Sequence, residues 1–210
     1  MIRVLIADDH PIVRQGLQQI LGDTPDIRVV GEATNGKEAL DKVRVGAWDA
    51  VILDISMPDR NGLDVLKQLV SEMPGLPVLV LSMYSEDQFA MRVLKAGARG
   101  YLTKESAPDE LVKAIRKVVS GGTYVSACLA EKLAFEIGGD SSKLPHETLS
   151  DREFQVLRLI AAGKSVKETA VELSLSAKTV STYRARILTK MKLGTTAELI
   201  HYAIQNHLID

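Results

Sequence analysis

The chain has 210 residues, of which 46% are hydrophobic, and a formal net charge of −1. This length fits one large domain or two modest ones, and the composition excludes an intrinsically disordered chain. No apolar run approaches the roughly 20 residues that span a bilayer, and the first residues lack the cleavage pattern of a signal peptide. The single cysteine, Cys128, cannot form an internal disulfide. We therefore expect a cytoplasmic protein with no membrane partner.

Five short apolar runs alternate with amphipathic segments over the first 120 residues. Strands are predicted at 4–7, 28–31, 50–53, 78–81 and 100–103, and helices at 11–21, 36–45, 62–72, 87–96 and 108–119. Several of the runs are continuous in Val, Ile and Leu, as is typical of strands that are buried on both sheet faces. Pro11 and Pro108 fall in first helical turns, where proline is tolerated. Residues 1–120 are therefore predicted to form an α/β, doubly wound, five-stranded parallel sheet.

Polar side chains follow four of these predicted strands. Asp8 and Asp9 follow the first strand, Asp54 follows the third, Ser82 the fourth and Lys104 the fifth. The carboxyl ends of parallel strands meet at one edge of the sheet. Three acids at one edge repel one another and need a cation, and their oxygen ligands suit Mg²⁺. The pattern predicts a pocket in which one carboxylate attacks phosphorus, while Lys104 and Ser82 bind phosphoryl oxygens.

Four segments together match a known motif: Asp8-Asp9, Asp54-Ile55-Ser56-Met57-Pro58 with Gly62, Ser82, and Tyr101-Leu102-Thr103-Lys104. In these positions residues 1–120 resemble the receiver domain of bacterial two-component response regulators, whose fold is flavodoxin-like. The resemblance implies that Asp54 is the phospho-acceptor and that Asp9 is a direct Mg²⁺ ligand. It further implies that Asp8 acts largely through a metal-bound water and that the main-chain carbonyl of Ser56 completes the protein ligands.

The same resemblance assigns a switch to Ser82 and Tyr101, a hydroxyl–aromatic pair that rearranges on phosphorylation. One departure is that Glu105 follows Lys104, where many receivers have a proline preceded by a cis peptide. His10 lies beside the acids, which favours a metal ligand as one reading, but we interpret it as a helix-start imidazole that points elsewhere. Each motif alone also has a plain structural reading, as a strand-end turn or a core residue, but four strand ends agree in order and spacing.

Residues 121–146 have the character of a linker. Gly121-Gly122 ends the fifth helix, a short helix is possible over 127–137, and residues 138–142 read Gly-Gly-Asp-Ser-Ser. This places a domain boundary between residues 1–120 and residues 147–210. The second domain is predicted to contain four helices, at 151–161, 165–173, 177–191 and 195–206, and the first of them has a capping box formed by Ser150 and Glu153.

Residues 165–185 have the pattern of a helix-turn-helix, with a short helix, a connection at 174–176 and a longer helix capped by Ser176. Val180, Ile187 and Met191 share the face of the longer helix that is expected to pack on the domain. The opposite face carries small and polar side chains with basic neighbours, which suits base edges and phosphates. These outer residues are Lys178, Thr182, Ala185 and Thr189, flanked by Ser181 and Arg186.

The charge of this region supports a polyanionic partner. Residues 164–192 contain seven Lys/Arg and two Asp/Glu, whereas residues 1–120 contain 15 and 17. A basic block in an otherwise neutral chain favours DNA as its partner, although an ordinary solvated helical surface is the alternative.

A second set of residues matches a family motif: Leu149-Ser150-Asp151-Arg152-Glu153, Val156-Leu157, Ala162-Gly163-Lys164-Ser165, Ala170 with Leu173, and residues 176–183. The segment resembles the LuxR-type module of the NarL/FixJ class of response regulators. By this resemblance Ser181, Thr182 and Ala185 face base edges of double-stranded DNA. The phosphate contacts that it implies are Lys164, Ser165, Lys167, Lys178, Thr179, Arg184 or Arg186, and Lys190. The last helix would pair two modules in a homodimer.

Two departures from that family stand in the DNA-reading region: Val166 replaces a common asparagine and Tyr183 replaces a frequent histidine. The resemblance implies a transcription regulator that a sensor histidine kinase phosphorylates on Asp54, with no enzymatic activity beyond its own phosphorylation and dephosphorylation. One alternative is a phospho-switch that acts on a protein partner through an adaptor helical domain. A phosphatase with an aspartate nucleophile is another, although Ser56 stands where that class has a second aspartate.

Overall fold

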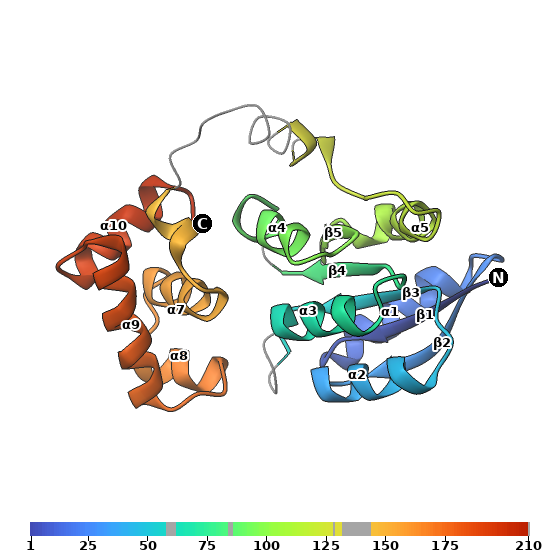
Figure 1. Ribbon diagram of the computed structural model, residues 1–210, viewed down its shortest axis with the longest axis horizontal. Helices are drawn as coiled ribbons and strands as arrows, with labels where there is room; N and C mark the ends of the chain where they lie inside the picture. Colours follow the sequence, from blue (N-terminus) through green and yellow to red (C-terminus); the bar gives the residue numbers. More distant parts are fainter. Residues whose placement is uncertain (58–61, 84–85, 128, 132–143, 210) are drawn as a thin grey trace. The chain divides into compact units, whose positions relative to one another are not determined.

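The protein is described by a computed structural model that covers residues 1–57, 62–83, 86–127, 129–131 and 144–209. The chain divides into two compact units, Met1–Ile137 and Gly138–Asp210, and the division falls within the predicted linker (Figure 1). Residues 127 and 129–131 are helical, whereas Pro58, Cys128 and the rest of the predicted linker helix and spacer lie outside the described residues.

The first unit is built around a parallel five-stranded sheet with the order β2-β1-β3-β4-β5. Its elements are β1 (Ile2–Ala7), α1 (Pro11–Gly22), β2 (Ile27–Ala33), α2 (Gly36–Val45), β3 (Ala50–Asp54), α3 (Gly62–Glu72), β4 (Val78–Ser82), α4 (Glu86–Lys95), β5 (Gly100–Thr103) and α5 (Ala107–Val119). The predicted α/β parallel fold is confirmed, and most element ends lie within one or two residues of the prediction.

Both faces of this sheet are buried, which explains the continuous apolar runs. Val4 and Ile6 face a core cluster that includes Leu17 of α1 and Leu111 of α5. Leu5 lies between them on β1, so its side chain points to the other face, and it is buried as well. Each such side chain contributes about 1.5–3 kcal/mol on burial, so the sheet is held from two sides.

The chain that follows α5 returns to the outer edge of the sheet. Tyr124 forms an isolated parallel bridge with Gly100, the Tyr101 N–H donates to the Tyr124 carbonyl at 3.3 Å, and the Tyr124 N–H donates to the Arg99 carbonyl at 2.8 Å. The Tyr124 hydroxyl donates to Glu110 Oε2 of α5 at 2.6 Å. The first part of the predicted linker is therefore attached to β5.

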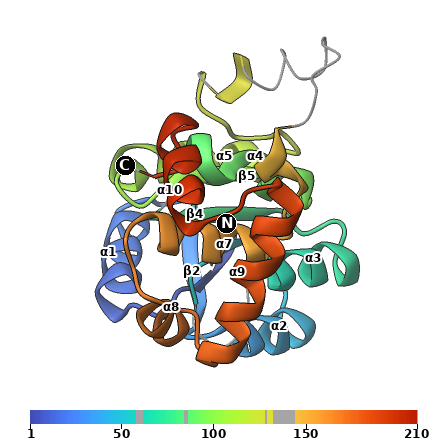
Figure 2. The ribbon, with the colours of Figure 1, turned by 90° about the vertical axis from the view of Figure 1, so that its left-hand side faces the viewer.

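The second unit is helical, with a 3₁₀ turn η1 (Pro145–Thr148) and the helices α7 (Asp151–Ala161), α8 (Val166–Glu172), α9 (Ala177–Met191) and α10 (Thr196–Gln205). Helix α9 packs on α7 and α8, and α10 packs on α7 (Figure 2). The predicted capping box of Ser150 and Glu153 is confirmed, and Ser165 and Glu168 form a second one. Over the part of the chain that is described, no helix has both the length and the apolar character to cross a membrane.

Candidate functional site

The strand order brings the predicted acidic residues to one edge of the sheet. β1 and β4 lie on either side of β3, with Ala7 opposite Leu53 and Asp54 opposite Leu81. Because β1 and β3 are parallel and in this register, Asp8, which follows Ala7, comes beside Asp54. Two carboxylates that are far apart in the sequence therefore share one pocket.

Lys104, which follows β5, reaches both of these acids. Asp8 and Asp54 are each only 1% exposed. Lys104 Nζ donates a hydrogen bond to Asp54 Oδ2 at 2.7 Å and lies 2.8 Å from Asp8 Oδ2. One ammonium group thus faces two buried carboxylates, which leaves a net negative charge in a pocket where unpaired charge is costly.

The pKa values follow from this arrangement. Burial raises the pKa of Asp54 above its ordinary value, and the charge of Asp8 adds to the rise, while the pairing with Lys104 opposes it. Burial by itself would lower the pKa of Lys104, but the carboxylates of Asp54 and Asp8 outweigh it and raise that pKa. Lys104 is therefore a permanent cation, and a further cation would favour the ionised form of Asp54.

The acidic residues are close enough to hold one metal ion. Asp8, Asp9, His10 and Asp54 each offer a ligand atom, and these atoms lie within 4.8 Å of one another. Lys104 Nζ is the cationic group that lies next to this cluster, 2.8 Å from Asp8 Oδ2 and 2.7 Å from Asp54 Oδ2. Three carboxylates that face one ammonium group keep a negative charge, and their oxygen atoms fit a divalent cation.

Ser56 lies next to this cluster. Its N–H donates to Asp54 Oδ1 at 2.8 Å, which orients the carboxylate. Ligation of a metal by the Ser56 carbonyl stays a prediction.

The interpretation of His10 as pointing away from the acids is wrong. His10 Nδ1 lies 3.2 Å from Asp8 Oδ1 and 3.0 Å from Asp9 Oδ1. The positions of His10, Asp8 and Asp9 in the sequence do not determine where the imidazole ring points, because this depends on the rotamer of a single side chain at a helix start.

The predicted switch residues Ser82 and Tyr101 both have 0% exposure. The Ser82 carbonyl accepts from the Lys104 N–H at 2.7 Å, which ties the end of β4 to the residue that contacts Asp54. The ring of Tyr101 is already buried in this conformation. An inward movement of the ring would therefore have to start from a different conformation, in which the ring is exposed. The switch role of the pair stays a prediction.

Arg14 supports the acidic pocket and was missed by the sequence reasoning. Its guanidinium donates to the Asp8 carbonyl at 2.7 Å, and its Nε lies 2.9 Å from Glu32 Oε2 on β2. The side chain is largely buried. An arginine on a predicted amphipathic helix looks like a surface residue in the sequence, so only the tertiary structure reveals this contact.

The helix-turn-helix presents most of its predicted DNA-facing residues to solvent. Val180, Ile187 and Met191 are buried, as predicted. Exposed residues are Ser165, Lys167, Lys178, Ser181, Thr182, Ala185, Arg186 and Lys190, and half-buried ones are Lys164, Thr179 and Arg184. The surface that these residues form has the polar and basic composition expected of a nucleic-acid contact.

Several of these residues also have structural partners. Lys190 Nζ lies 2.7 Å from Oε2 of the buried Glu153, and Lys164 is paired with Glu172. Ser165 Oγ accepts from the Glu168 N–H and so caps α8. The DNA contacts predicted for these residues, and for the rest of this surface, stay predictions.

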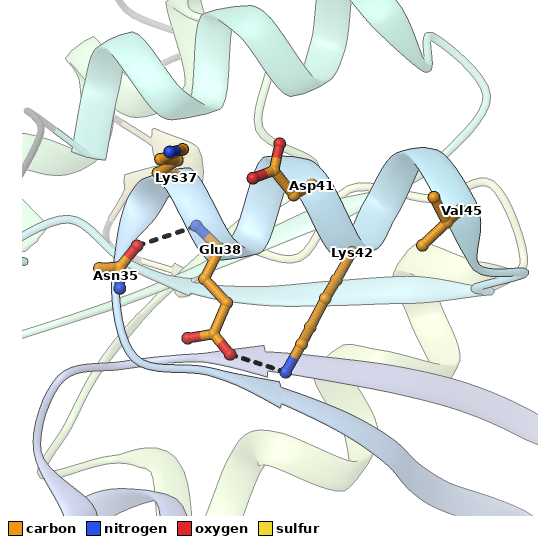
Figure 3. A pocket seen from close by; sticks show the side chains of 6 residues that line it. All are labelled: Asn35, Lys37, Glu38, Asp41, Lys42 and Val45. Atoms are coloured by element: carbon orange, nitrogen blue, oxygen red, sulfur yellow. Dashed lines mark hydrogen bonds and ion pairs between the residues drawn. The ribbon is translucent and has the colours of Figure 1, made fainter.

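Two surface pockets lie away from the acidic cluster. One, of about 500 Å³, lies along α2 and is lined by Asn35, Lys37, Glu38, Asp41, Lys42 and Val45. In it Asn35 caps the helix and Glu38 pairs with Lys42 at 2.8 Å (Figure 3). The other, of about 260 Å³, lies in the second unit and is lined partly by Lys164, Ser165 and Arg184, next to the predicted DNA surface.

Known proteins are similar to both units. Residues 4–116 match the family described as response regulator receiver domain, and residues 147–203 match bacterial regulatory proteins, luxR family. The chain is 39% identical to the response regulator UvrY of Escherichia coli (strain K12) over 209 residues, which is 99% of this chain and 96% of UvrY. It is 39% identical to the response regulator GacA of Pseudomonas protegens over 210 residues, which is 100% of this chain and 99% of GacA.

A solved structure extends this similarity to the full length. RcsB from Salmonella enterica serovar Typhimurium, bound to promoter rprA in the presence of the phosphomimetic BeF₃⁻, has a TM-score of 0.67 and 30% identity, over 96% of this chain and 97% of that one.

Proposed function

Because the chain belongs to the bacterial response regulators that join a receiver domain to a LuxR-type domain, we propose that a sensor histidine kinase phosphorylates Asp54 and thereby controls DNA binding by the second unit. The observation that carries this proposal is the position of Asp54, which shares the ammonium group of Lys104 with Asp8 at the carboxyl edge of the sheet. Control of a protein partner through an adaptor domain is the rival function.

The chemistry at Asp54 is a phosphoryl transfer. A carboxylate oxygen of Asp54 attacks phosphorus, the bond from phosphorus to the donor breaks, and the donor leaves with that electron pair. Lys104, which now pairs with Asp54 Oδ2, then pairs with a phosphoryl oxygen, and the Ser82 hydroxyl donates to another. Turnover is limited to this self-phosphorylation and to hydrolysis of the product.

Mg²⁺ is the cation that we propose for the acidic pocket. Its ligands would be Asp8, Asp9, Asp54 and the Ser56 carbonyl. The cation would neutralise the negative charge that builds up when a phosphoryl group approaches three carboxylates.

DNA binding is proposed for the exposed face of α9, in the bacterial cytoplasm where DNA is available. The similarity to RcsB, which binds a promoter, supports this assignment. Helix α10 buries Leu199 and Ala203 within its own unit and leaves Ile204 57% exposed. That exposed side chain suits the pairing of two copies, which would set two copies of α9 on adjacent half-sites.

The test of this function uses the full chain incubated with acetyl phosphate and Mg²⁺. We expect a labile mass increase at Asp54, dimerisation, and stronger retention on duplex DNA that weakens steeply with salt. Asp54→Ala should lose all three gains from the phosphodonor. Uptake of phosphate by Asp54→Ala would show that the acceptor is misassigned. If the protein showed no salt-dependent retention on duplex DNA, the adaptor function would be favoured.

A further inference from the structure

The chain that follows α5 crosses the outer edge of the sheet as a strap, a name used here for residues 123–127 with 129–131. The sheet order ends at β5, and among the described residues only an isolated bridge between Tyr124 and Gly100 continues the pairing at this edge. A Cβ atom placed on Gly100 would lie 3.0 Å from the Tyr124 carbonyl oxygen and 3.1 Å from the Tyr124 Cβ. The strap therefore lies directly against an edge that would otherwise be open.

Side chains attach the strap to both helices that pack on β5. The Tyr124 hydroxyl donates to Glu110 Oε2 of α5 at 2.6 Å. The Ser126 hydroxyl donates to Oε2 of Glu86, the first residue of α4. Leu129, farther along the strap, is only 2% exposed. The strap thus reaches from α5 to α4 across the edge of β5.

Tyr101 lies on the side of β5 that the strap closes. Leu102 belongs to the core cluster that includes Leu111 of α5. Neighbouring residues of a strand point to opposite faces, so Tyr101 points to the face on which α4 packs, and its exposure is 0%. Because β4 pairs with the inner side of β5, the short way from this face to solvent leads past the outer edge. The strap crosses that edge, and its Tyr124 carbonyl accepts from the Tyr101 N–H at 3.3 Å.

We propose that the strap is a lock that keeps the ring of Tyr101 buried, and that the hydrogen bond between Ser126 and Glu86 is its release point. Both residues are half-buried, so this bond can break by local opening while the sheet stays folded. The chain continues from the strap to the second unit, which couples the position of the Tyr101 ring to the anchoring of the linker.

Such a coupling acts in both directions. Release of the strap lets the ring of Tyr101 become exposed, and an event that draws the ring inward holds the strap in place. The lock itself does not depend on phosphorylation. The inference rests on the proposed function only where phosphorylation of Asp54 is the event that draws the ring inward.

The experiment measures nitration of Tyr101 by tetranitromethane in the full-length chain, with the modified residue located by mass spectrometry. The reaction needs an accessible ring, so Tyr101 should react slowly in the wild type. We expect Ser126→Ala and Glu86→Ala each to react roughly fivefold or more faster, because each removes the same hydrogen bond to a charged group. Glu131→Ala, which removes an exposed carboxylate of the strap, is the matched control and should react like the wild type.

The double variant of Ser126→Ala and Glu86→Ala separates the lock from local effects. Ser126 also caps the helical turn that follows it, because the Leu129 N–H donates to Ser126 Oγ at 3.2 Å. Separate effects on this cap and on the start of α4 would multiply in the double variant. Loss of one shared bond should instead give the double variant the rate of the single variants. Rates that multiply, or wild-type rates in both single variants, would overturn the inference.

Acetyl phosphate with Mg²⁺ distinguishes this inference from the proposed function. The phosphodonor should return the nitration of Tyr101 in Ser126→Ala toward the wild-type rate, and added Asp54→Ala should abolish that effect. Fast nitration in the single variants without a labile mass on Asp54 would overturn the proposed function and support the lock. A labile mass on Asp54, with Tyr101 reacting at the wild-type rate in both single variants, would overturn the lock and support the proposed function.

Discussion

Gly62, the first residue of α3, shows at the scale of one residue why the motif around Asp54 contains a glycine. A Cβ atom placed on Gly62 would lie 2.3 Å from the Cα of Ile55 and 2.7 Å from its carbonyl carbon. Both atoms belong to the backbone that follows Asp54, so neither can rotate away. The start of α3 can approach the chain after Asp54 this closely only because residue 62 has no side chain.

The first prediction therefore concerns Gly62→Ala. Alanine in an exposed helix would ordinarily stabilise it, but here the backbone must shift, and we expect a loss of about 2 kcal/mol in the free energy of unfolding. Phosphate uptake from acetyl phosphate should slow as well. Urea unfolding and mass spectrometry measure the two effects. Gly75→Ala, whose added Cβ meets nothing within 4 Å, is the control and should stay within about 0.5 kcal/mol of the wild type.

At the scale of elements, one ion pair connects the longest helix of the second unit to the start of another. Lys190, in the last turn of α9, pairs with Glu153 of α7, which is 3% exposed. The same Glu153 oxygen accepts from the Ser150 N–H at 2.8 Å and so belongs to the capping box of α7. The pair thus fixes the position of α9 relative to α7 and gives Lys190 a role besides the predicted phosphate contact.

Salt dependence distinguishes the two roles of Lys190. Lys178, exposed in the first turn of α9, is expected to contact phosphate, so Lys178→Gln should lower the slope of log affinity against log salt concentration by about 1. If Lys190 acts through Glu153, Lys190→Gln should weaken DNA binding without changing that slope. Binding isotherms on one duplex at several salt concentrations measure both. An equal loss of slope in the two variants would show that Lys190 reaches phosphate.

The same pair predicts a pH dependence. Burial alone would raise the pKa of Glu153, but its hydrogen bonds with Lys190 and Ser150 lower the pKa below the ordinary value of 4.5. A lowered carboxyl pKa means that the stabilisation is complete above about pH 4.5 and is lost as the pH falls through the folded-state value. Amides of α7 should therefore exchange roughly tenfold faster in Glu153→Gln at pH 7, and this difference should shrink at pH 3.

The control for this measurement is Glu147→Gln, a change at an exposed carboxylate just before α7. It should leave the exchange of α7 amides unchanged at both pH values. A difference between Glu153→Gln and the wild type that persists undiminished at pH 3 would contradict the assignment of the stabilisation to the ionised Glu153.

At the scale of the whole molecule, hydrogen bonds along β5 connect the proposed phosphorylation site to the linker. Ser82 and Lys104 meet at the ends of β4 and β5, and Tyr101 on β5 donates its N–H to Tyr124. Burial, with the hydrogen bond to Glu110, raises the pKa of Tyr124 to about 12, so this hydroxyl remains a donor at neutral pH. A change at Ser82 and Tyr101 would therefore reach the first residues of the linker.

Ser82→Ala tests this route. The variant keeps Asp54 and Lys104, so we expect the labile mass on Asp54 to form, while most of the gain in DNA affinity on phosphorylation is lost. A typical coupling of 1–3 kcal/mol makes that gain roughly tenfold or more in the wild type. Ser71→Ala, on the exposed side of α3, is the control. A full gain in Ser82→Ala would exclude the hydroxyl from the switch.

The sequence by itself determined the two folds, the strand-end residues Asp8, Asp54, Ser82 and Lys104, and the apolar face of α9. They follow from the local periodicity of apolar residues and from the rule that the carboxyl ends of parallel strands lie at one edge of the sheet. Both can be recognised in short segments of the sequence. The capping box at Ser150 is local in the same sense, because its two partners lie three residues apart.

Only the tertiary structure decided the contacts between residues that are distant in sequence or free to rotate. Arg14 meets the Asp8 carbonyl and Glu32, and Lys190 meets Glu153, through the packing of separate elements. His10 turns its ring to the acids by the choice of one rotamer. Such choices depend on neighbours in space, which no period in the sequence encodes.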